Sequence, residues 1–236
     1  MSVFHFKQFA VDQSGCAMKI NTDGVLLAAM ATADFPTRML DVGTGTGVIS
    51  LMLAQRFPSA MIDAIEIDAI AADTAGRNFE RSPFEDRLTI HAVALGEFEP
   101  KAPYDLIVSN PPFFLDSLRS DDNRKGMARH TDMNFFDQLL ALSKQWLSPT
   151  GCLQIILPTN LASRVEQHAI RNYGLALRAS TTIRSFSSHS PIRQVLFLGS
   201  TTETGTSSET DFVIYERRGV YSTAYRKLLG PFFLAF

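Results

Sequence analysis

Hydrophobic and polar residues alternate in blocks along the chain, with short apolar runs separated by segments of helical periodicity. Two of these segments predict helices: residues 48–57 and 69–79. Four apolar runs have the length of buried strands: residues 38–42, 61–67, 88–92 and 104–109. Strands that alternate with helices in this way predict an α/β fold, with a mostly parallel sheet covered by helices on both faces.

The second half of the chain contains more strand than helix. Helical spacing resumes at residues 135–147, and Pro149-Thr150-Gly151 is a turn that leads into the next strand. The expected elements that follow are a strand at 152–157, a helix at 160–172, and strands at 178–183, 195–199 and 212–215. Residues 201–209 contain only Thr, Ser, Gly and Glu, which predicts a flexible connection without a packed core.

The composition indicates an ordinary soluble protein. Hydrophobic residues make up 45% and charged residues 19% of the 236 residues. The longest apolar runs are too short to span a bilayer, and the N-terminus lacks the layout of a secretory signal. Cys16 and Cys152 lie far apart and form no metal-binding spacing. We therefore expect a cytoplasmic monomer without a metal site, folded as a single domain over residues 1–236.

A glycine-rich segment joins the strand at 38–42 to the helix at 48–57. It reads Asp41-Val42-Gly43-Thr44-Gly45-Thr46-Gly47. Glycines let the backbone turn sharply and let a ligand approach where a Cβ would collide. The N-terminus of the following helix presents free N–H groups to a carboxylate or a phosphate. The segment alone is equally typical of a plain strand–helix turn.

Two carboxylates narrow the choice of ligand. Glu66 lies at the end of the second strand, where it can accept hydrogen bonds from both hydroxyls of a ribose. This position favours a nucleoside-containing cofactor, and the spacing alone also admits a nicotinamide dinucleotide. Asp41 suits a cationic amino-acid tail better than a pyrophosphate, so we expect a cofactor with adenosine and an amino group. Asp68 is either a further cofactor contact or the N-cap of the helix at 69–79.

The segment Asn110-Pro111-Pro112-Phe113 follows the fourth strand. An exocyclic amine on a planar base is a poor nucleophile because its lone pair is delocalised into the ring. The Asn110 side-chain oxygen and the Pro111 carbonyl can accept hydrogen bonds from such an amine, and the two prolines restrict the backbone that carries them. Phe113 can stack on an extruded base. The alternative is a turn with Phe113 in the core, but parallel sheets bind ligands at this end of their strands.

In this order, the three segments resemble the class I S-adenosylmethionine-dependent methyltransferases. The resemblance implies a Rossmann-like fold with a mostly parallel seven-stranded sheet, and S-adenosyl-L-methionine as the cofactor. The cofactor contacts that it implies are Asp41, Gly43, Thr44, Gly45, Gly47, Glu66 and Asp68. The catalytic residues that it implies are Asn110, Pro111, Pro112 and Phe113.

Both ends of the chain narrow the resemblance. Phe6-Lys7-Gln8-Phe9, residues 18–27 and the tail at 221–236 are similar to the bacterial tRNA (adenine-37 N6) methyltransferase family, which acts on valine tRNA beside the anticodon. The resemblance implies that residues 1–33 form an N-terminal extension over the cofactor site. The residues of this extension that would line the site are Lys19, Thr22, Asp23 and Gly24. Thr22 or Asp23 can also be the N-cap of a helix at residues 25–33.

Two positions depart from that family. The segment His91-Ala92-Val93-Ala94-Leu95 lacks the aspartate that many relatives place after the third strand, and Ala235 stands where a basic residue is expected. Three alternatives stay open beside tRNA adenine methylation. Two of them change the acceptor, to the N2 of a ribosomal RNA guanine or the N5 of a protein glutamine. The third retains the fold as a non-catalytic cofactor-binding module.

A tRNA partner needs positive charge near the site, whereas the net charge of the chain is −2. A local basic patch can supply that charge. One group of candidates follows Phe113: Arg119, Arg124, Lys125, Arg129 and His130. A second group lies near the C-terminus: Arg217, Arg218, Arg226 and Lys227. The alternative for each group is a solvated surface.

Overall fold

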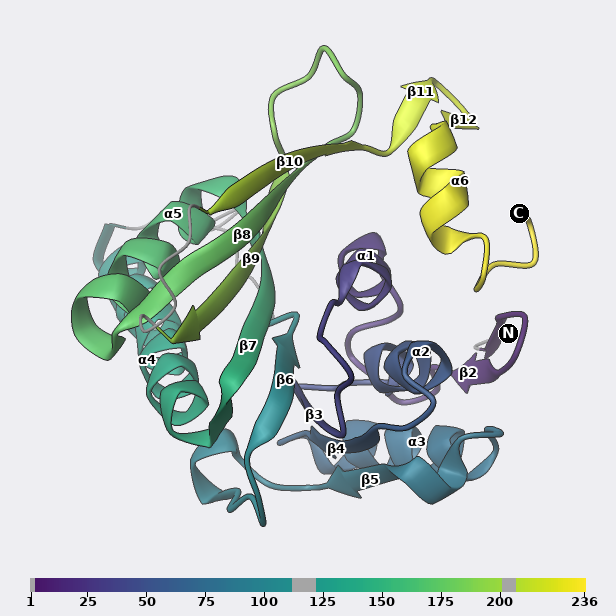
Figure 1. Ribbon diagram of the computed structural model, residues 1–236, viewed down its shortest axis with the longest axis horizontal. Helices are drawn as coiled ribbons and strands as arrows, with labels where there is room; N and C mark the ends of the chain where they lie inside the picture. Colours follow the sequence, from purple (N-terminus) through teal and green to yellow (C-terminus); the bar gives the residue numbers. More distant parts are fainter. Residues whose placement is uncertain (1–2, 112–121, 201–206) are drawn as a thin grey trace.

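The computed structural model describes residues 3–111, 122–200 and 207–236, and the side chains of these residues outside 122–132. Its centre is an eight-stranded sheet (Figure 1). In order across the sheet, the strands are β10 (Ser208–Val213), β8 (Leu175–Arg184), β9 (Arg193–Ser200), β7 (Leu147–Pro158), β6 (Tyr104–Ser109), β3 (Arg38–Val42), β4 (Met61–Ile65) and β5 (Leu88–His91). Every neighbouring pair is parallel except the two pairs that include β9. The expected α/β fold is confirmed.

The sheet has eight strands, whereas the resemblance implied seven. The additional edge strand is β10, which pairs in parallel with β8. Ser208 and Glu209, expected in a flexible connection, belong to this strand and lie opposite Ala179 and Ser180. Backbone hydrogen bonds to a sheet edge can hold a strand whose side chains are polar, which composition does not reveal. The strand expected at residues 212–215 is divided, because β10 ends there and a hairpin begins.

Helices cover both faces of the sheet (Figure 1). On one face lie α1 (Thr22–Met30), α2 (Val48–Arg56) and α3 (Ala69–Glu80), with α6 (Thr223–Leu229) packed beside α1. On the other lie α4 (Asp122–Trp146) and α5 (Thr159–His168). Leu27, Leu51 and Ile62 belong to the first core, and Leu40 and Leu140 to the second. Burial on both faces explains why the parallel strands are almost continuously apolar.

The first helix differs from the sequence expectation at both ends. It spans Thr22–Met30 rather than residues 25–33, and its N-cap is Asn21 rather than Thr22 or Asp23. The Asn21 Oδ1 accepts a hydrogen bond from the Gly24 backbone N–H at 2.9 Å. Asn is among the strongest N-caps because it satisfies an N–H that has no partner within the helix. Residues expected before the helix therefore form its first turn.

Two boundaries in the second half of the chain also differ. Pro149-Thr150-Gly151 is not a turn before a strand but part of β7, whose pairing with β6 is irregular at Tyr104. A Cβ at Gly151 would lie 2.6 Å from the Tyr104 carbonyl oxygen, so this close approach requires glycine. The helix expected at 160–172 is α5 followed by a π-helical turn, Ala169–Tyr173.

The two ends of the chain meet on one side of the molecule (Figure 1). Two antiparallel hairpins lie there: β1 (Val3–His5) with β2 (Ala10–Asp12), and β11 (Tyr215–Arg217) with β12 (Val220–Tyr221). Phe6 forms a β-bridge with Phe233, and Lys7 Nζ donates hydrogen bonds of 2.6 Å to the carbonyls of Gly230 and Phe236. Short 3-10 turns, Glu85–Arg87 and Leu95–Glu97, flank β5.

The N-terminal extension passes along α3 before it reaches α1. Asn78 Nδ2, on α3, donates hydrogen bonds of 2.9 Å to the carbonyls of Asp12 and Thr46, and its Oδ1 accepts one from the Asp12 N–H. The Thr74 hydroxyl donates a hydrogen bond of 3.1 Å to the Ser14 carbonyl. The extension is thus held beside the glycine-rich segment, since Thr46 belongs to that segment.

Candidate active site

The glycine-rich segment is a loop at the carboxyl end of β3. Gly43, Gly45 and Gly47 have φ angles of 74°, 57° and 81°, a region of backbone space that other residues rarely adopt. A Cβ at Gly47 would lie 2.5 Å from Phe79 Cε1, so this glycine lets the loop pack on α3. A Cβ at Gly43 or Gly45 would meet no described atom within 4 Å. The loop is therefore close-packed at Gly47 and open at the other two glycines.

Asp41, in β3, is hydrogen-bonded to this loop and to the helix that follows it. Its side chain is fully buried, and its Oδ2 accepts hydrogen bonds from the hydroxyls of Thr44 (2.6 Å) and Ser50 (2.7 Å). Its Oδ1 is buried without a hydrogen-bond partner among the described residues. Burial raises the pKa of the Asp41 carboxyl to about 6, against the opposing effect of the two hydroxyls and of the Ser50 backbone N–H. A cationic group brought to this end of β3 would favour the ionised carboxylate.

Glu66 contacts the same loop from the end of the neighbouring strand, β4. It follows the last residue of β4, Ile65, so the second strand is shorter than expected. One carboxylate oxygen accepts a hydrogen bond from the Gly45 N–H at 2.9 Å, and the other accepts one from the Asp68 N–H at 3.0 Å. The Gly43 N–H donates to the Ile65 carbonyl at 2.9 Å. Two carboxylates, Asp41 and Glu66, therefore flank one glycine loop.

Asp68 is the N-cap of α3. Its Oδ1 accepts hydrogen bonds from the N–H groups of Ile70 (2.8 Å) and Ala71 (3.2 Å). The helix-cap interpretation is confirmed, and a cofactor contact stays a prediction.

His91, the last residue of β5, contacts a carboxylate on the neighbouring strand β4. His91 Nε2 lies 2.9 Å from Asp63 Oδ1, while Asp63 Oδ2 accepts hydrogen bonds from Tyr104 (2.7 Å) and Arg38 (2.8 Å). The His91 carbonyl accepts a hydrogen bond of 3.1 Å from the Glu66 N–H. The end of β5 therefore supports Glu66 through its backbone.

Asn110 follows the last residue of β6, one strand away from the glycine loop. Its Nδ2 donates a hydrogen bond of 3.4 Å to Asn21 Oδ1, at the start of α1. A Cβ at Gly24 would lie 3.3 Å from the same Nδ2, so α1 and Asn110 approach closely. Pro111 is buried, whereas Pro112 and Phe113 lie outside the described residues. The structure thus brings the Asn110 amide, the glycine loop and the N-terminal extension together at the carboxyl ends of β3 and β6.

Known proteins are similar to this chain over most of its length. The family model described as Methyltransferase small domain matches residues 16–173. The tRNA1(Val) (adenine(37)-N6)-methyltransferase of Pedobacter heparinus is 46% identical over 235 residues, covering 100% of this chain and 99% of that protein. A protein of the same name from Porphyromonas gingivalis is 40% identical, covering 98% of this chain and 94% of its own length. The chain belongs to this methyltransferase family.

Solved structures agree with the fold. A predicted O-methyltransferase from Agrobacterium tumefaciens has a TM-score of 0.66 at 16% identity, covering 89% of this chain and 96% of that one. A human methyltransferase 10 domain containing protein has a TM-score of 0.56 at 17% identity, covering 79% and 85%. At these identities the likeness supports the methyltransferase fold and nothing about the acceptor.

The residues expected from the N-terminal signature of this methyltransferase occupy different environments. Lys19 and Thr22 are exposed, whereas Gly24 is buried against Asn110. Asp23 forms an ion pair with Arg193, 2.6 Å from Nε to Oδ2. Sequence reasoning did not identify Arg193, because the pair joins residues 170 positions apart. It also missed Asn21, although Asn before an apolar helix is a typical N-cap signal.

The predicted RNA-binding residues are only partly described. Arg119 lies outside the described residues, and Arg124, Lys125, Arg129 and His130 are on α4 without described side chains. Four cations near the C-terminus are exposed: Arg217, Arg218, Arg226 and Lys227.

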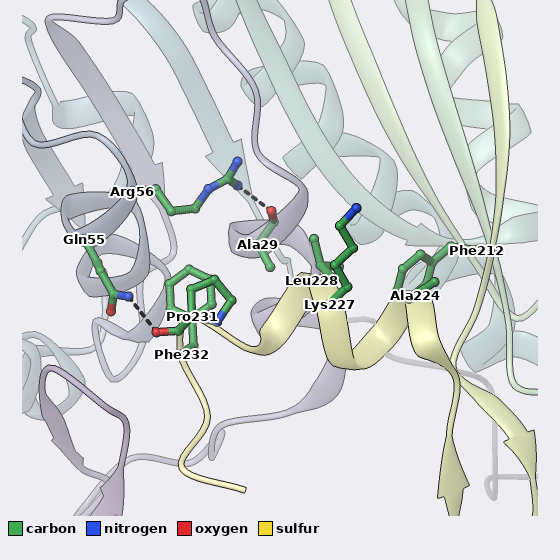
Figure 2. Close-up of a pocket in the computed structure, with 9 residues that line it drawn as sticks. All are labelled: Ala29, Gln55, Arg56, Phe212, Ala224, Lys227, Leu228, Pro231 and Phe232. Atoms are coloured by element: carbon green, nitrogen blue, oxygen red, sulfur yellow. Dashed lines mark hydrogen bonds between the residues drawn. The ribbon is translucent and has the colours of Figure 1, made fainter. Parts of the chain in front are cut away.

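A cavity of about 550 Å³ lies between α1, α2 and α6 (Figure 2). Lys227 lines it together with Arg56, whose Nη1 donates a hydrogen bond of 2.7 Å to the Ala28 carbonyl. Neither the glycine loop nor Asn110 contributes to its walls. We therefore place the candidate active site at the strand ends rather than in this cavity.

Within residues 3–111, 122–200 and 207–236, no three His, Cys, Asp or Glu side chains gather as a possible metal site. The helices of these segments include none that is long and apolar enough to cross a membrane.

Proposed function

We propose that the protein transfers a methyl group from S-adenosyl-L-methionine to the exocyclic N6 amine of adenine 37, beside the anticodon of valine tRNA. The observation that carries this proposal is the position of Asn110. Its amide lies at the carboxyl end of β6, next to a glycine loop flanked by two carboxylates. The full-length relatives from Pedobacter heparinus and Porphyromonas gingivalis, which carry this activity in their names, support the choice of acceptor.

The residues present fit the cofactor. The unpaired buried Oδ1 of Asp41 favours a ligand with an ammonium group, and Glu66 is positioned to accept hydrogen bonds from ribose hydroxyls. The open sides of Gly43 and Gly45 leave room for a ligand against the backbone. The cofactor supplies a methyl group that its sulfonium makes electrophilic. Lys19, Thr22, Asp23 and Gly24 would close the site from the N-terminal side.

Asn110 and Pro111 bind and activate the amine that accepts the methyl group. The Asn110 Oδ1 and the Pro111 carbonyl accept hydrogen bonds from the two N–H groups of the adenine amine, which draws the nitrogen lone pair out of conjugation. They also stabilise the positive charge that develops on this nitrogen as the bond to the methyl carbon forms. The transfer is complete when the nitrogen loses one of its two protons to water. Pro112 restricts the backbone behind them, and Phe113 stacks on the extruded base. Positioning and exclusion of water then lower the rest of the barrier.

The tRNA is held by cations rather than by the aromatic residues of the tail. Tyr221 stacks on Tyr215 (5.0 Å between ring centroids) and on Tyr225 (4.5 Å), so these rings are occupied by one another. Arg217 and Arg218 are exposed beside this stack and are free to meet phosphates, as are Arg226 and Lys227 on α6. We also propose that the chain is a cytoplasmic monomer, and that residues 1–236 form one domain.

The test is methyl transfer to a valine tRNA transcript, with nucleoside mass spectrometry of the product. We expect N6-methyladenosine from the natural transcript and none from a transcript with guanine at position 37. Asn110→Ala should lower kcat about 100-fold or more, as expected for removal of a group that acts on developing charge. Its affinity for S-adenosylmethionine in calorimetry should stay within about twofold, since Asn110 contacts the acceptor.

Asn172→Ala is the matched control, because Asn172 is exposed and distant in the sequence from both motifs. We expect this variant to methylate tRNA at the wild-type rate. Label that appears only in a ribosomal RNA guanine or a protein glutamine would replace the proposed acceptor. A protein that binds no S-adenosylmethionine would refute the activity altogether.

A further inference from the structure

Asn21 joins the start of α1 to Asn110. Its Oδ1 accepts a hydrogen bond of 2.9 Å from the Gly24 N–H and one of 3.4 Å from the Asn110 Nδ2. The first of these bonds is the helix cap, and it requires the acceptor atom of the Asn21 amide at that place. The cap therefore fixes which end of the Asn21 amide faces Asn110.

This arrangement also determines the orientation of the Asn110 amide. An amide has one acceptor end and one donor end, and Asn21 presents an acceptor. If Asn110 turned its amide by half a turn, its Oδ1 would face Asn21 Oδ1, and two acceptors would oppose each other. The favourable orientation points Nδ2 at Asn21 and leaves Oδ1 free for another donor. A free Oδ1 is what an adenine amine requires of Asn110.

A second contact anchors the same turn of α1. Asp23 Oδ2 lies 2.6 Å from Arg193 Nε, and the two side chains are only 20% and 25% exposed. Arg193 is the first residue of β9 and lies opposite Pro158, the last residue of β7. Because β7 neighbours β6, the ion pair fixes the start of α1 to the strand ends that carry Asn110. Because the pair is partly buried, water and salt screen its electrostatic attraction less than they screen that of a surface pair.

We propose that Asn21 and the Asp23–Arg193 pair are positioning residues, which orient the Asn110 amide so that its oxygen faces the methyl acceptor. The inference deepens the proposed function and rests on it for the role of Asn110. Asn21 acts directly on the amide. The Asp23–Arg193 pair acts one step further away, by holding the helical turn on which Asn21 depends.

Two substitutions of Asn21 separate positioning from helix capping. Asn21→Ser keeps an N-cap, but its shorter side chain does not reach Asn110. Asn21→Asp keeps both the cap and an acceptor for Asn110 Nδ2. With saturating tRNA and S-adenosylmethionine, we expect Asn21→Ser to lower kcat about fivefold, the scale of one lost hydrogen bond. Asn21→Asp should retain at least about half of the wild-type kcat.

The Asp23–Arg193 pair is tested in the same assay. Arg193→Gln should lower kcat about threefold, and Arg193→Lys, which keeps a cation opposite Asp23, should recover most of that loss. The melting temperature and the affinity for S-adenosylmethionine are measured for every variant. A purely structural role would lower these two quantities in parallel with kcat, and that result would overturn the proposal. Equal kcat for Asn21→Ser and the wild type would also overturn it.

A readout that needs no turnover completes the test. In the 15N-labelled protein, the Asn110 side-chain NH2 signal is assigned by its disappearance in Asn110→Asp. We expect its exchange with water to be slower in the wild type and in Asn21→Asp than in Asn21→Ser. Equal exchange in all three would refute the positioning role, whatever the substrate is. Slow exchange in a protein that never methylates tRNA would refute the proposed acceptor and leave the orientation of Asn110 established.

Discussion

The cofactor half and the acceptor half of the candidate site are built in different ways. Around the glycine loop, partners are close in sequence: Asp41 binds Thr44 and Ser50, and Gly45 binds Glu66, 21 positions away. Around Asn110, partners are remote, because Asn21 lies 89 positions away. A motif can therefore carry most of the geometry of the first half. The second half exists only once the extension, β6 and β9 have packed together.

The largest effect on stability is expected at the close-packed end of the glycine loop. Gly47→Ala should lower the free energy of unfolding by about 3 kcal/mol, from the strained left-handed backbone together with overpacking. The added Cβ would lie 2.5 Å from Phe79 Cε1, at a φ of 81°. Urea unfolding followed by circular dichroism measures the change.

Gly43→Ala is the matched control for this prediction. Gly43 has a similar φ of 74°, but an added Cβ meets no described atom within 4 Å. We expect it to cost about 1 kcal/mol, from the backbone alone. If the two variants were equally destabilised, packing on α3 would not be what distinguishes the two ends of the loop.

The same contrast explains how much the sequence could predict. The core strands, the glycine loop and the position of Glu66 follow from apolar runs and local spacing, which fix short-range geometry. The sequence offers the N-cap role of Asp68 as one of two interpretations, because the partners of a cap, here Ile70 and Ala71, are its neighbours in the chain. Each of these features depends on neighbours in the chain or on residues within one strand–helix–strand unit.

The features that the sequence did not reveal depend on tertiary contacts. The Asp23–Arg193 pair requires β9 to lie near α1, and a single sequence carries no signal for that. The first two residues of β10, Ser208 and Glu209, are expected in a flexible connection because their side chains are polar, whereas pairing with β8 holds them in the sheet. Asn21 is an instructive exception. Its capping role was readable, but its contact with Asn110 was not.

A second, smaller effect is expected where the two halves meet. The buried Asn78 side chain joins Asp12 of the extension to Thr46 of the glycine loop through three hydrogen bonds of 2.9 Å. Asn78→Ala should lower the free energy of unfolding by about 2 kcal/mol, since it leaves buried backbone groups without partners. Gln167→Ala, at an exposed site on α5, is the control and should change stability by less than about 0.5 kcal/mol. An unchanged stability of Asn78→Ala would mean that the halves fold independently.

The smallest effect concerns Asp41 and follows from its pKa, which burial raises to about 6. The pKa of this carboxyl is higher in the folded than in the unfolded state, so Asp41 makes the folded protein less stable as the pH rises. Its stabilising contribution is complete below the unfolded pKa of about 4 and is lost as the pH rises through about 6. Binding of a cationic ligand has the opposite sign, because only the ionised carboxylate attracts an ammonium group.

The affinity for S-adenosylmethionine should therefore fall as the pH drops below about 6, approaching tenfold per pH unit, if the ionised form of Asp41 is the one that binds. Isothermal titration calorimetry between pH 5 and pH 8 measures this acidic limb. In Asp41→Asn, a neutral side chain of the same shape, the limb should disappear and the affinity near pH 7 should be lower. An acidic limb that persisted in Asp41→Asn would assign the titration to another group. The pH dependence of cofactor binding would then not arise from Asp41 and its local contacts. The cofactor half of the site would in that case depend on more distant groups, as the acceptor half does.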